Sequence, residues 1–514
     1  MILITSGTYV DLEFQNELGK LPPSFLPLSN SRLYSYQIDL LKKNLPKQKI
    51  FLSLPSDFQL TYADKLNLKH QNITILRIKH NLSLNESIVS SLAQSKNKDK
   101  ELYILHGDTL IKNINNQLDK IYLSNTKLEF SYEIEKSINY NNLAWCGFFS
   151  FSNKKKLTNC LKRQNSFENA VKNYDKINPL KKTYSKVWFD FGHINTYFQS
   201  KSNFLSKRYF NDLNITNNIL TKSSKHKTKI KAEYEWFEKI PPDLKIYIPN
   251  LIRCSQTRQY QSYEMEYQPS LTLSEIFVYG DKTTLFWSQA LEECNIFLKN
   301  AKKIKSKKQD SDYYINFIKN FSIRINEYKK MNSIDFNKKI IFNGKKLPSI
   351  NNIIKKLSKK IILYKSSNTV IHGDFCLSNI LFNSRNNSIK LIDPKGSDFK
   401  SKNTIYGDHY YDIAKLGHSI IGLYDHIIAG NYRYKMSENF DKIKIDFEVL
   451  YDYKISDTIK LFEKKFLNKH DKNKIVKIIS ILFLSMLPLH SDSKSKQLAF
   501  LFNFLRIYQE YKIK

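Results

Sequence analysis

The chain has 514 residues, which is too long for one hydrophobic core and predicts two or three domains. With 41% hydrophobic and 13% aromatic residues and only 13 glycines and 13 prolines, long disordered segments are not expected. The net charge of +34 comes from lysines scattered along the chain, with short runs such as Lys154–Lys156 and Lys302–Lys308. This distribution indicates solvated lysine-rich faces rather than a nucleic-acid-binding protein.

The five cysteines show no CxxC pair and no metal-ligand spacing, which predicts neither a zinc site nor a disulfide framework and fits a reducing cytoplasm. Met1 is followed directly by the apolar run Ile2–Ile4, which predicts a first strand rather than a signal peptide. The apolar stretch Ile478–Leu489 is too short to cross a bilayer and predicts a buried helix. We therefore expect a soluble, cytoplasmic protein with no transmembrane segment.

The first part of the chain alternates short apolar runs with amphipathic stretches, which is typical of an α/β sheet with crossover helices. Its predicted helices include Ser35–Lys43 and Leu82–Ala93. The predicted strands are Met1–Thr5, Lys49–Leu54, Ile73–Ile78, Glu101–His106 and Trp145–Phe151. We place the first domain at residues 1–203.

Two carboxylates stand out in this first domain. Asp108 ends a strand in YILHGDT (Tyr103–Thr109), and Asp190 precedes a glycine in VWFDFGHINTY (Val187–Tyr197). Between them, AWCGFFSF (Ala144–Phe151) forms a strand of small and aromatic residues.

Together with the opening ILITSGTY, these segments resemble sugar-nucleotide pyrophosphorylases and phosphocholine cytidylyltransferases. The resemblance implies a Rossmann-like, GT-A-like mixed sheet. It also implies that Gly7 and Lys20 bind the triphosphate of CTP or UTP and that Asp108 and Asp190 hold Mg²⁺. The chain departs from this family in its first loop, because it lacks the GxGxR pattern and the Pro-Lys pair. The first domain can therefore be an active nucleotidyltransferase or a degenerate binding module.

From about Lys207 the pattern changes to a small β-rich lobe. Strands are predicted at Tyr209–Ser223, Tyr247–Arg253 and Tyr263–Tyr267, with one helix at Lys229–Lys239. Helices dominate afterwards, and the lysine-rich Lys299–Ser311 is expected to be a surface insertion. We place the second domain at residues 204–514, divided into an N-lobe (about 204–268) and a C-lobe (about 269–514).

Residues Val370–Lys395 read VIHGDFCLSNILFNSRNNSIKLIDPK, in which two apolar strands each run into a carboxylate. Asp374 can accept a hydroxyl proton, and Asn379 and Asp393 can hold Mg²⁺ that bridges the phosphates of a nucleotide. The HGDxxxxN and I-D motifs resemble the aminoglycoside phosphotransferase and choline kinase families. This resemblance implies a bilobal α+β protein-kinase-like fold and ATP-dependent phosphoryl transfer to an alcohol, with Asp374 as the catalytic carboxylate.

The same resemblance requires an N-lobe lysine on a strand and a glutamate on the next helix. Lys222 in NNILTKS and Glu233 in KIKAEYEWF fit these roles. Glu233 is preferred over Glu235 because its apolar neighbours would face inward at helical spacing.

The strand YEMEY is predicted to be either an interlobe hinge, where the backbone of Met265 and Tyr267 binds a nucleobase, or an ordinary edge strand. Asp412, in GDHYYDIAKLGHSIIGLYD, is expected to bind the backbone of the catalytic loop. His372 is expected to brace the same loop rather than act as an acid or base.

The two domains would catalyse consecutive reactions, phosphorylation of a hydroxyl and then transfer of a nucleotide to that phosphate. The whole chain resembles bifunctional proteins of bacterial capsular or surface polysaccharide biosynthesis. The expected ligands are nucleoside triphosphates and a small alcohol or sugar. Two alternatives stay open: a single-activity kinase with a degenerate first domain, and a choline kinase joined to a phosphocholine cytidylyltransferase. A scaffold without activity is the least supported interpretation, because Asp374, Asn379 and Asp393 are all present.

Overall fold

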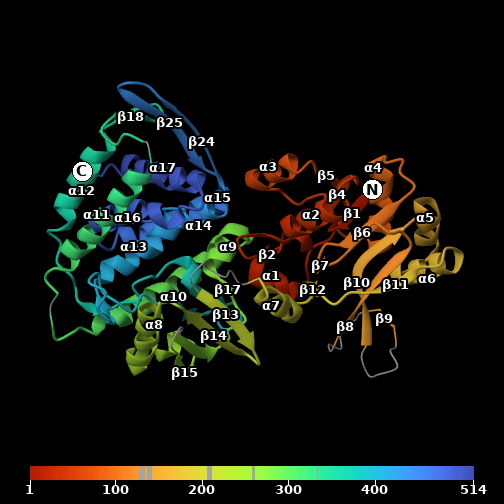
Figure 1. The fold of residues 1–514 in the computed structure, drawn as a ribbon, viewed down its shortest axis with the longest axis horizontal. Helices are drawn as coiled ribbons and strands as arrows, with labels where there is room; N and C mark the ends of the chain where they lie inside the picture. The colour runs from red at the N-terminus through yellow and green to blue at the C-terminus, as the bar shows by residue number, and fades with distance from the viewer. Residues whose placement is uncertain are drawn as a thin grey trace. The chain divides into compact units, whose positions relative to one another are not determined.

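The structure is a computed structural model that describes residues 1–126, 133–135, 142–204, 211–257, 261–308, 310–332 and 334–513. The chain separates into two compact units (Figure 1). Unit 1 comprises Met1–Leu205 and Tyr279–Asp281, and unit 2 comprises Ser206–Val278 and Lys282–Lys514. Within the described ranges, no helix has the length and apolar character needed to cross a membrane.

Unit 1 is built on one mixed sheet with the strand order β11-β8-β10-β6-β1-β4-β5, and β9 pairs with β10. Strands β6, β1, β4 and β5 pair in parallel, whereas β10 runs antiparallel to both β6 and β8. The mixed sheet expected from the sequence is therefore confirmed. The strands are β1 (Ile2–Thr5), β4 (Ile50–Pro55), β5 (Thr74–Ile78), β6 (Leu102–His106), β8 (Lys120–Thr126), β9 (Ile134–Glu135), β10 (Asn142–Phe151) and β11 (Lys181–Tyr184).

Helices cover both faces of this sheet, which explains why β1 is apolar at every position. Leu3 belongs to a core that includes residues of α4, α5 and α6, whereas Ile2 and Ile4 belong to a second core with residues of α2 and α3. Successive side chains of a strand point to opposite faces, so a strand buried on both sides has no polar alternation. The helices of unit 1 are α1 (Leu12–Leu18), α2 (Leu33–Asn44), α3 (Tyr62–His70), α4 (Leu84–Ser95), α5 (Lys154–Arg163), α6 (Phe167–Ile177) and α7 (Ile194–Ser202).

A short two-stranded ladder lies beyond the carboxyl end of β6. Strand β7 (Thr109–Ile111) pairs antiparallel with β12 (Trp188–Asp190), and Thr109 lies opposite Asp190. The segment between β6 and β7 contains Asp108. This pairing therefore brings Asp108 close to Asp190, although the two residues lie far apart in the sequence.

Unit 2 begins with an antiparallel sheet of order β13-β14-β16-β15, and α8 (Lys227–Lys239) lies against it (Figure 1). The strands are β13 (Asn211–Thr216), β14 (Ile219–Ser224), β15 (Leu251–Gln256) and β16 (Gln261–Glu266). Asn217 and Asn218 form the turn between β13 and β14, both with positive φ (50° and 61°), which suits a tight hairpin turn.

Part of the sequence prediction for this lobe is wrong. Residues Pro242–Tyr247 form a 3-10 helix, and the strand predicted from Tyr247 begins only at Leu251. Pro241 and Pro242 explain the error, because proline has no N–H for a strand ladder and suits the first turn of a helix. The first two residues of the predicted strand Tyr209–Ser223 lie outside the described residues.

The remainder of unit 2 is mainly helical. Helix α13 packs against α16, which in turn packs against α17. Residues 474–485 of α16 are all buried, so the prediction of a buried helix in Ile478–Leu489 is confirmed, with its last turn completed by the 3-10 helix Leu487–His490. The helices are α9 (Leu273–Tyr279), α10 (Thr284–Lys303), α11 (Tyr313–Met331), α12 (Ile350–Ile361), α13 (His409–Ile420), α14 (Tyr424–Ile428), α15 (Tyr453–Phe462), α16 (Lys472–Ser485) and α17 (Lys494–Glu510).

Short strands separate these helices. Strand β20 pairs with β23, and β21 pairs with both β22 and β17, while β19-β18-β25-β24 form a separate sheet. The strands are β17 (Leu271–Thr272), β18 (Lys339–Phe342), β19 (Lys345–Leu347), β20 (Thr369–Val370), β21 (Ile380–Asn383), β22 (Ser388–Leu391), β23 (Tyr406–Gly407), β24 (Tyr432–Glu438) and β25 (Lys442–Val449).

The lysine-rich segment Lys299–Ser311 is largely exposed, as expected from its composition, but it also pairs with the rest of unit 2. Its first residues complete α10, which ends at Lys303. The Ile304 carbonyl then accepts the Val370 N–H (3.0 Å), and the Ser306 N–H donates to the Asn368 carbonyl (3.0 Å). The segment therefore supports β20, the strand that leads into the Asp374 loop. Gln309 lies outside the described residues.

Candidate functional site

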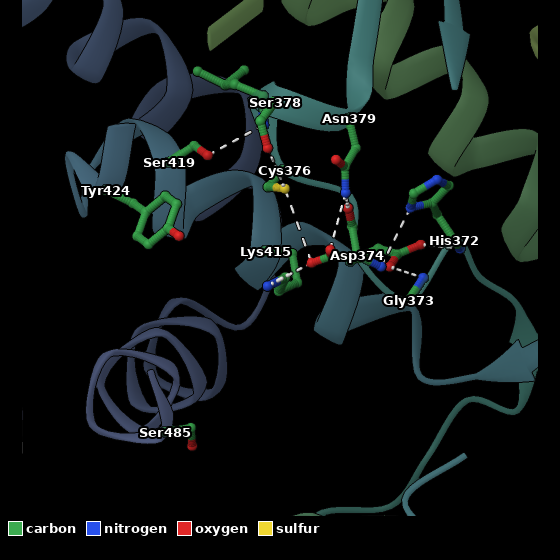
Figure 2. Close-up of polar contacts among 12 residues, drawn as sticks. His372, Gly373, Asp374, Cys376, Ser378, Asn379, Lys415, Ser419, Tyr424 and Ser485 are labelled. Carbon is green, nitrogen blue, oxygen red and sulfur yellow. Dashed lines mark hydrogen bonds and ion pairs between the residues drawn. The ribbon is translucent and has the colours of Figure 1, made fainter. Parts of the chain in front are cut away.

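The loop that carries Asp374 follows β20 and ends in a 3-10 helix at Leu377–Asn379. The Asn379 Nδ2 donates to the Asp374 backbone oxygen at 2.9 Å and to its Oδ2 at 3.0 Å, so the two predicted residues lie side by side (Figure 2). The Asp374 side chain is 38% exposed. The carboxylate is therefore held in place by the loop and still accessible to a ligand.

Asp412, on the first turn of α13, fixes the backbone of this loop. Its two carboxylate oxygens accept the N–H groups of His372 (2.7 Å) and Gly373 (2.8 Å). Burial raises the pKa of Asp412 to about 7, and the two backbone hydrogen bonds act against this shift. The expected contact between Asp412 and the loop backbone is confirmed.

His372 connects the Asp374 loop to the segment that carries Asp393. Its Nε2 lies 3.0 Å from the Ile392 carbonyl, to which it donates, and its Nδ1 accepts the Asp374 N–H at 3.3 Å. Burial lowers the pKa of His372 to about 4. A neutral ring protonated on Nε2 satisfies both bonds, which agrees with a bracing role.

Gly373 is the one residue of this loop whose conformation requires glycine. Its φ is +78°, and a Cβ placed there would lie 2.8 Å from the Cβ of Lys395. The Lys395 N–H also donates to the His372 carbonyl at 3.0 Å. The loop of Asp374 and the segment after Asp393 therefore approach each other at their backbones.

The predicted N-lobe residues meet at Asp393. The Nζ of Lys222, on β14, lies 2.6 Å from the Glu233 Oε2 on α8 and 2.9 Å from the Asp393 Oδ1. The Tyr263 hydroxyl donates to the same glutamate at 3.0 Å. Burial alone would lower the pKa of Lys222, but the carboxylates of Asp393 and Glu233 raise it, so the lysine stays protonated.

Asp393 itself has a left-handed backbone, with φ of +56°. This conformation costs a residue with a side chain about 1–2 kcal/mol, although aspartate tolerates it better than most. The left-handed turn lies directly after β22 and lets the carboxylate reach Lys222 of the N-lobe.

Met265 and Tyr267 lie at the end of β16. Met265 is buried, and its backbone lies opposite Leu220 on one side and Leu251 on the other. The Tyr267 N–H donates to the Asn218 carbonyl at 2.8 Å. The β13–β14 turn therefore engages the Tyr267 N–H, and the nucleobase contact of Met265 and Tyr267 stays a prediction.

Two lysines next to Asp374 were missed by the sequence reasoning. The Lys415 Nζ, on α13, lies 2.6 Å from the Asp374 Oδ1 (Figure 2). Burial alone would lower the pKa of Lys415, but Asp374 raises it above the usual value. The sequence feature that could have identified Lys415 is its position three residues after Asp412, on the same face of the helix.

The second missed lysine is Lys395. Its Nζ lies 3.6 Å from the centroid of the Phe399 ring and 5.9 Å from that of Tyr411. Burial lowers the pKa of Lys395 to about 7, opposed by the nearby Asp398. In a sequence with so many lysines, nothing in the local pattern distinguishes this one.

In unit 1, Asp108 and Asp190 lie on two sides of Gly192. A Cβ on Gly192 would lie 2.9 Å from the Asp108 Oδ2 and 3.3 Å from the Asp190 Oδ1, and the Gly192 N–H donates to the latter at 3.1 Å. Burial and the negative charge of Asp190 raise the pKa of Asp108 to about 6. Repulsion between two neighbouring carboxylates is relieved by a cation, which suits the predicted metal site.

Gln37 holds the loop that carries Asp108, and the sequence reasoning missed it. This side chain of α2 is fully buried, and its Nε2 donates to the carbonyls of His106 (3.1 Å), Gly107 (3.1 Å) and Thr109 (2.8 Å). A glutamine within a helix carries no sequence signal for this role.

Gly7 and Lys20 belong to the segment after β1. A Cβ on Gly7 would lie 2.7 Å from the Ser87 Oγ of α4, so glycine allows the loop to pass close to that helix. The Lys20 Nζ lies 3.4 Å from the Asp57 Oδ2 and 4.2 Å from the centroid of the Tyr9 ring. About half of the Lys20 side chain is exposed, which leaves it accessible to an anion.

Each predicted metal site offers two side chains with oxygen donors: Asn379 with Asp393, and Asp108 with Asp190. Among the described residues, no group of three or more His, Cys, Asp and Glu side chains could hold a metal ion, either at these two sites or at any other place. Protein-bound Mg²⁺ commonly takes one or two carboxylates and completes its shell with phosphate oxygens and water. The donor sets therefore suit Mg²⁺ bound together with a nucleotide.

No protein-family model and no curated protein sequence matches the chain. Among solved structures, it is similar to a nucleoside-diphosphate-sugar pyrophosphorylase from Vibrio cholerae (12% identity, TM-score 0.31, covering 39% of this chain and 99% of that one). It is also similar to a thermostable mutant of aminoglycoside phosphotransferase APH(4)-Ia (11% identity, TM-score 0.38, covering 60% of this chain and 93% of that one). A third similar structure is aminoglycoside-3'-phosphotransferase of type VIII (11% identity, TM-score 0.33, covering 54% of this chain and 95% of that one). Likenesses this weak assign no activity, so the function has to be argued from the residues of the two sites.

Proposed function

We propose that the chain is a bifunctional transferase, in which unit 2 phosphorylates a hydroxyl of a small molecule and unit 1 joins the resulting phosphate to a nucleotide. The observation that carries this proposal is the arrangement around Asp393. A buried lysine and glutamate of the N-lobe meet a carboxylate that follows the loop of Asp374 and Asn379. Such an arrangement suits a nucleotide held between a lobe that binds its phosphates and a loop that orients the acceptor.

In unit 2, Asp374 would orient the acceptor hydroxyl and take its proton as the oxygen attacks the γ-phosphorus of ATP. The bond between the γ-phosphorus and the β–γ bridging oxygen breaks, and ADP leaves. Lys222 would hold the α- and β-phosphates, positioned by Glu233. Asn379 and Asp393 would hold Mg²⁺, which neutralises charge on the phosphates when bound.

In unit 1, an oxygen of the monophosphate would attack the α-phosphorus of CTP or UTP, and pyrophosphate would leave. Asp108 and Asp190 would hold Mg²⁺ near the reacting phosphates. Gly7 and Lys20 would contact the triphosphate, supported by the exposure of the Lys20 amine. The departures from the expected first-loop motif keep the alternative of a degenerate binding module open for unit 1 only.

The product of the two steps is a nucleoside-diphosphate-activated compound, the form in which a building block enters a polysaccharide. The proposed role is therefore the supply of such a precursor for a bacterial capsule or surface polysaccharide. The choline alternative is less well supported, because the aromatic rings of Phe399 and Tyr411 already face the Lys395 amine. A quaternary ammonium group needs such rings for itself and would be repelled by the lysine.

Two variants of the full chain test the proposal. Asp374→Asn should abolish consumption of ATP with the free acceptor, with a loss of about 10²–10⁴-fold expected for removing a general base. The same protein should still convert added monophosphate and CTP or UTP to the activated product. Asp108→Ala should show the reverse and accumulate the monophosphate.

Thermal unfolding of both variants serves as the control for a correct fold. Near-normal turnover of the free acceptor by Asp374→Asn would refute the kinase assignment. Failure of every added monophosphate and nucleoside triphosphate to give product with Asp374→Asn would leave unit 1 as a binding module.

A further inference from the structure

Positively charged side chains lie near the loop of Asp374. Lys415 contacts the carboxylate directly at 2.6 Å, and Lys395 belongs to the segment whose backbone touches the same loop. Arg324, on α11, adds to the positive potential at Lys395. Lys415 is therefore paired with the carboxylate that is proposed to receive the acceptor hydroxyl, and Lys395 and Arg324 add positive charge nearby.

Carboxylates offset these cations only in part: Asp374 pairs with Lys415, and Asp398 opposes the lowering of the Lys395 pKa. Asp398 is the nearby acid, but its Oδ1 accepts the backbone N–H groups of Lys400 (2.8 Å) and Lys402 (2.9 Å). Asp412 likewise uses both oxygens for the backbone of His372 and Gly373. The Lys395 amine lies instead over the ring of Phe399 at 3.6 Å, a weaker partner than a carboxylate.

The desolvation of the Lys395 amine costs free energy, and a bound anion would compensate this cost. A partly buried ammonium group that faces an aromatic ring loses much of its hydration, and the ring replaces only part of the lost stabilisation. Asp374 must also turn toward the acceptor hydroxyl in the proposed reaction, which weakens its contact with Lys415. Both lysines then need an anion, and the acceptor is the molecule that arrives at this place.

We propose that the phosphoryl acceptor carries its own anionic group, a carboxylate or a phosphate, which Lys395 and Lys415 bind while Asp374 takes the hydroxyl. This inference rests on the proposed kinase function and names its substrate class. Lys395 and Lys415 are then positioning and specificity-determining residues. Neutral polyols and cationic amino alcohols bind less well, because they bring no negative charge to either lysine.

Matched acceptors test the proposal in the full chain with ATP, by measuring ADP release. One set is glycerol, D-glycerate and glycerol 3-phosphate, a second is glucose, glucuronate and glucose 6-phosphate, and choline serves as the cation. We expect kcat/KM to be at least tenfold higher for an anionic member than for the neutral member of its set. The carboxylate and phosphate members show which anion the site prefers.

Lys395→Met should bring the ratio between anionic and neutral acceptors to within about threefold of one, and Lys395→Arg should restore it. Lys400→Met is the matched control, because Lys400 belongs to the same segment and its exposed side chain makes a long contact (3.8 Å) to Asp312. Preference for a neutral acceptor or choline would overturn the proposal. An equal loss with all acceptors in Lys395→Met would overturn it as well, and would instead assign Lys395 to the transferred phosphoryl group.

A binding measurement separates this inference from the kinase assignment. Lys395 and Lys415 are labelled with an amine-reactive reagent in the full chain without ATP, and the modified peptides are quantified by mass spectrometry, with Lys400 as internal standard. D-glycerate or glycerol 3-phosphate should slow labelling of Lys395 at least threefold at constant ionic strength, whereas glycerol should not. Absence of protection by any anion overturns the inference even if the kinase is active. Protection without phosphorylation of any acceptor supports the anion site and counts against the kinase function alone.

Discussion

Replacing Glu233 by glutamine should destabilise unit 2 because it removes one partner of a buried ion pair. Lys222 and Glu233 have side chains only 3% and 2% exposed, and their charged atoms lie 2.6 Å apart. Breaking such a pair typically costs about 3–5 kcal/mol. Here Asp393 still neutralises Lys222 at 2.9 Å and glutamine keeps one oxygen, so we expect a loss of about 2–3 kcal/mol of unfolding free energy.

The matched control is Glu235→Gln on the same helix. Glu235 pairs at 2.5 Å with Lys239, whose side chain is 56% exposed, and such surface pairs contribute about 0–1 kcal/mol. Urea denaturation followed by circular dichroism would measure both variants, and ATP titration should show weaker binding, by about tenfold, for Glu233→Gln alone. Equal destabilisation by the two variants would refute the argument that Lys222 and Glu233 form the buried pair.

Three further results are expected. Gly192→Ala should lower nucleotidyl transfer by roughly 10²-fold with the fold kept, because its Cβ would lie 2.9 Å from the Asp108 Oδ2 and must displace that carboxylate; an unchanged rate would contradict the site. The pKa of His372 is lowered to about 4 by burial, so its contribution to stability is present above about pH 6.5 and is lost as the pH falls toward 4, by up to about 3 kcal/mol. The unfolding free energy of His372→Gln should therefore fall less over this range than that of the wild type, as measured by urea denaturation at several pH values. Finally, separately expressed residues 1–203 and 204–514 should each unfold cooperatively in calorimetry, and insoluble fragments without a transition would count against this boundary.

The sequence predicted the elements that carry strong local signals. Apolar runs of strand length located β1, β4, β5, β6 and β10, because strands buried on both faces leave few polar positions. The neighbours of Asp374 could also be predicted, since Asn379 lies only five residues away and Asp393 follows the next strand. What the sequence could not provide was the environment formed by distant segments.

Lys395 and Lys415 illustrate this limit. Lys395 does not differ in its local sequence from the other lysines, and the signal for Lys415 is only its spacing from Asp412. Their importance arises when α13 and the segment after β22 are brought to the same loop. In the lysine-rich segment at the end of α10, composition indicated the exposure of the side chains but not the pairing of the backbone. Ile304 pairs with β20 regardless of its charged neighbours. Gln37 is a third case, because a buried glutamine and an exposed one look alike in a helical pattern.

In the proposed reaction Asp393 contacts both Lys222 and Mg²⁺, and this links the binding of the metal to the binding of the nucleotide. Its Oδ1 is bonded to Lys222, yet the same carboxylate is proposed to hold Mg²⁺. A carboxylate neutralised by an ammonium group is a weaker ligand for a cation. Lys222 can leave Asp393 at little cost only when phosphate oxygens replace that contact, since Glu233 keeps the amine in place. We therefore expect the binding of the nucleotide and of Mg²⁺ to be coupled through Lys222, which links β14 to Asp393.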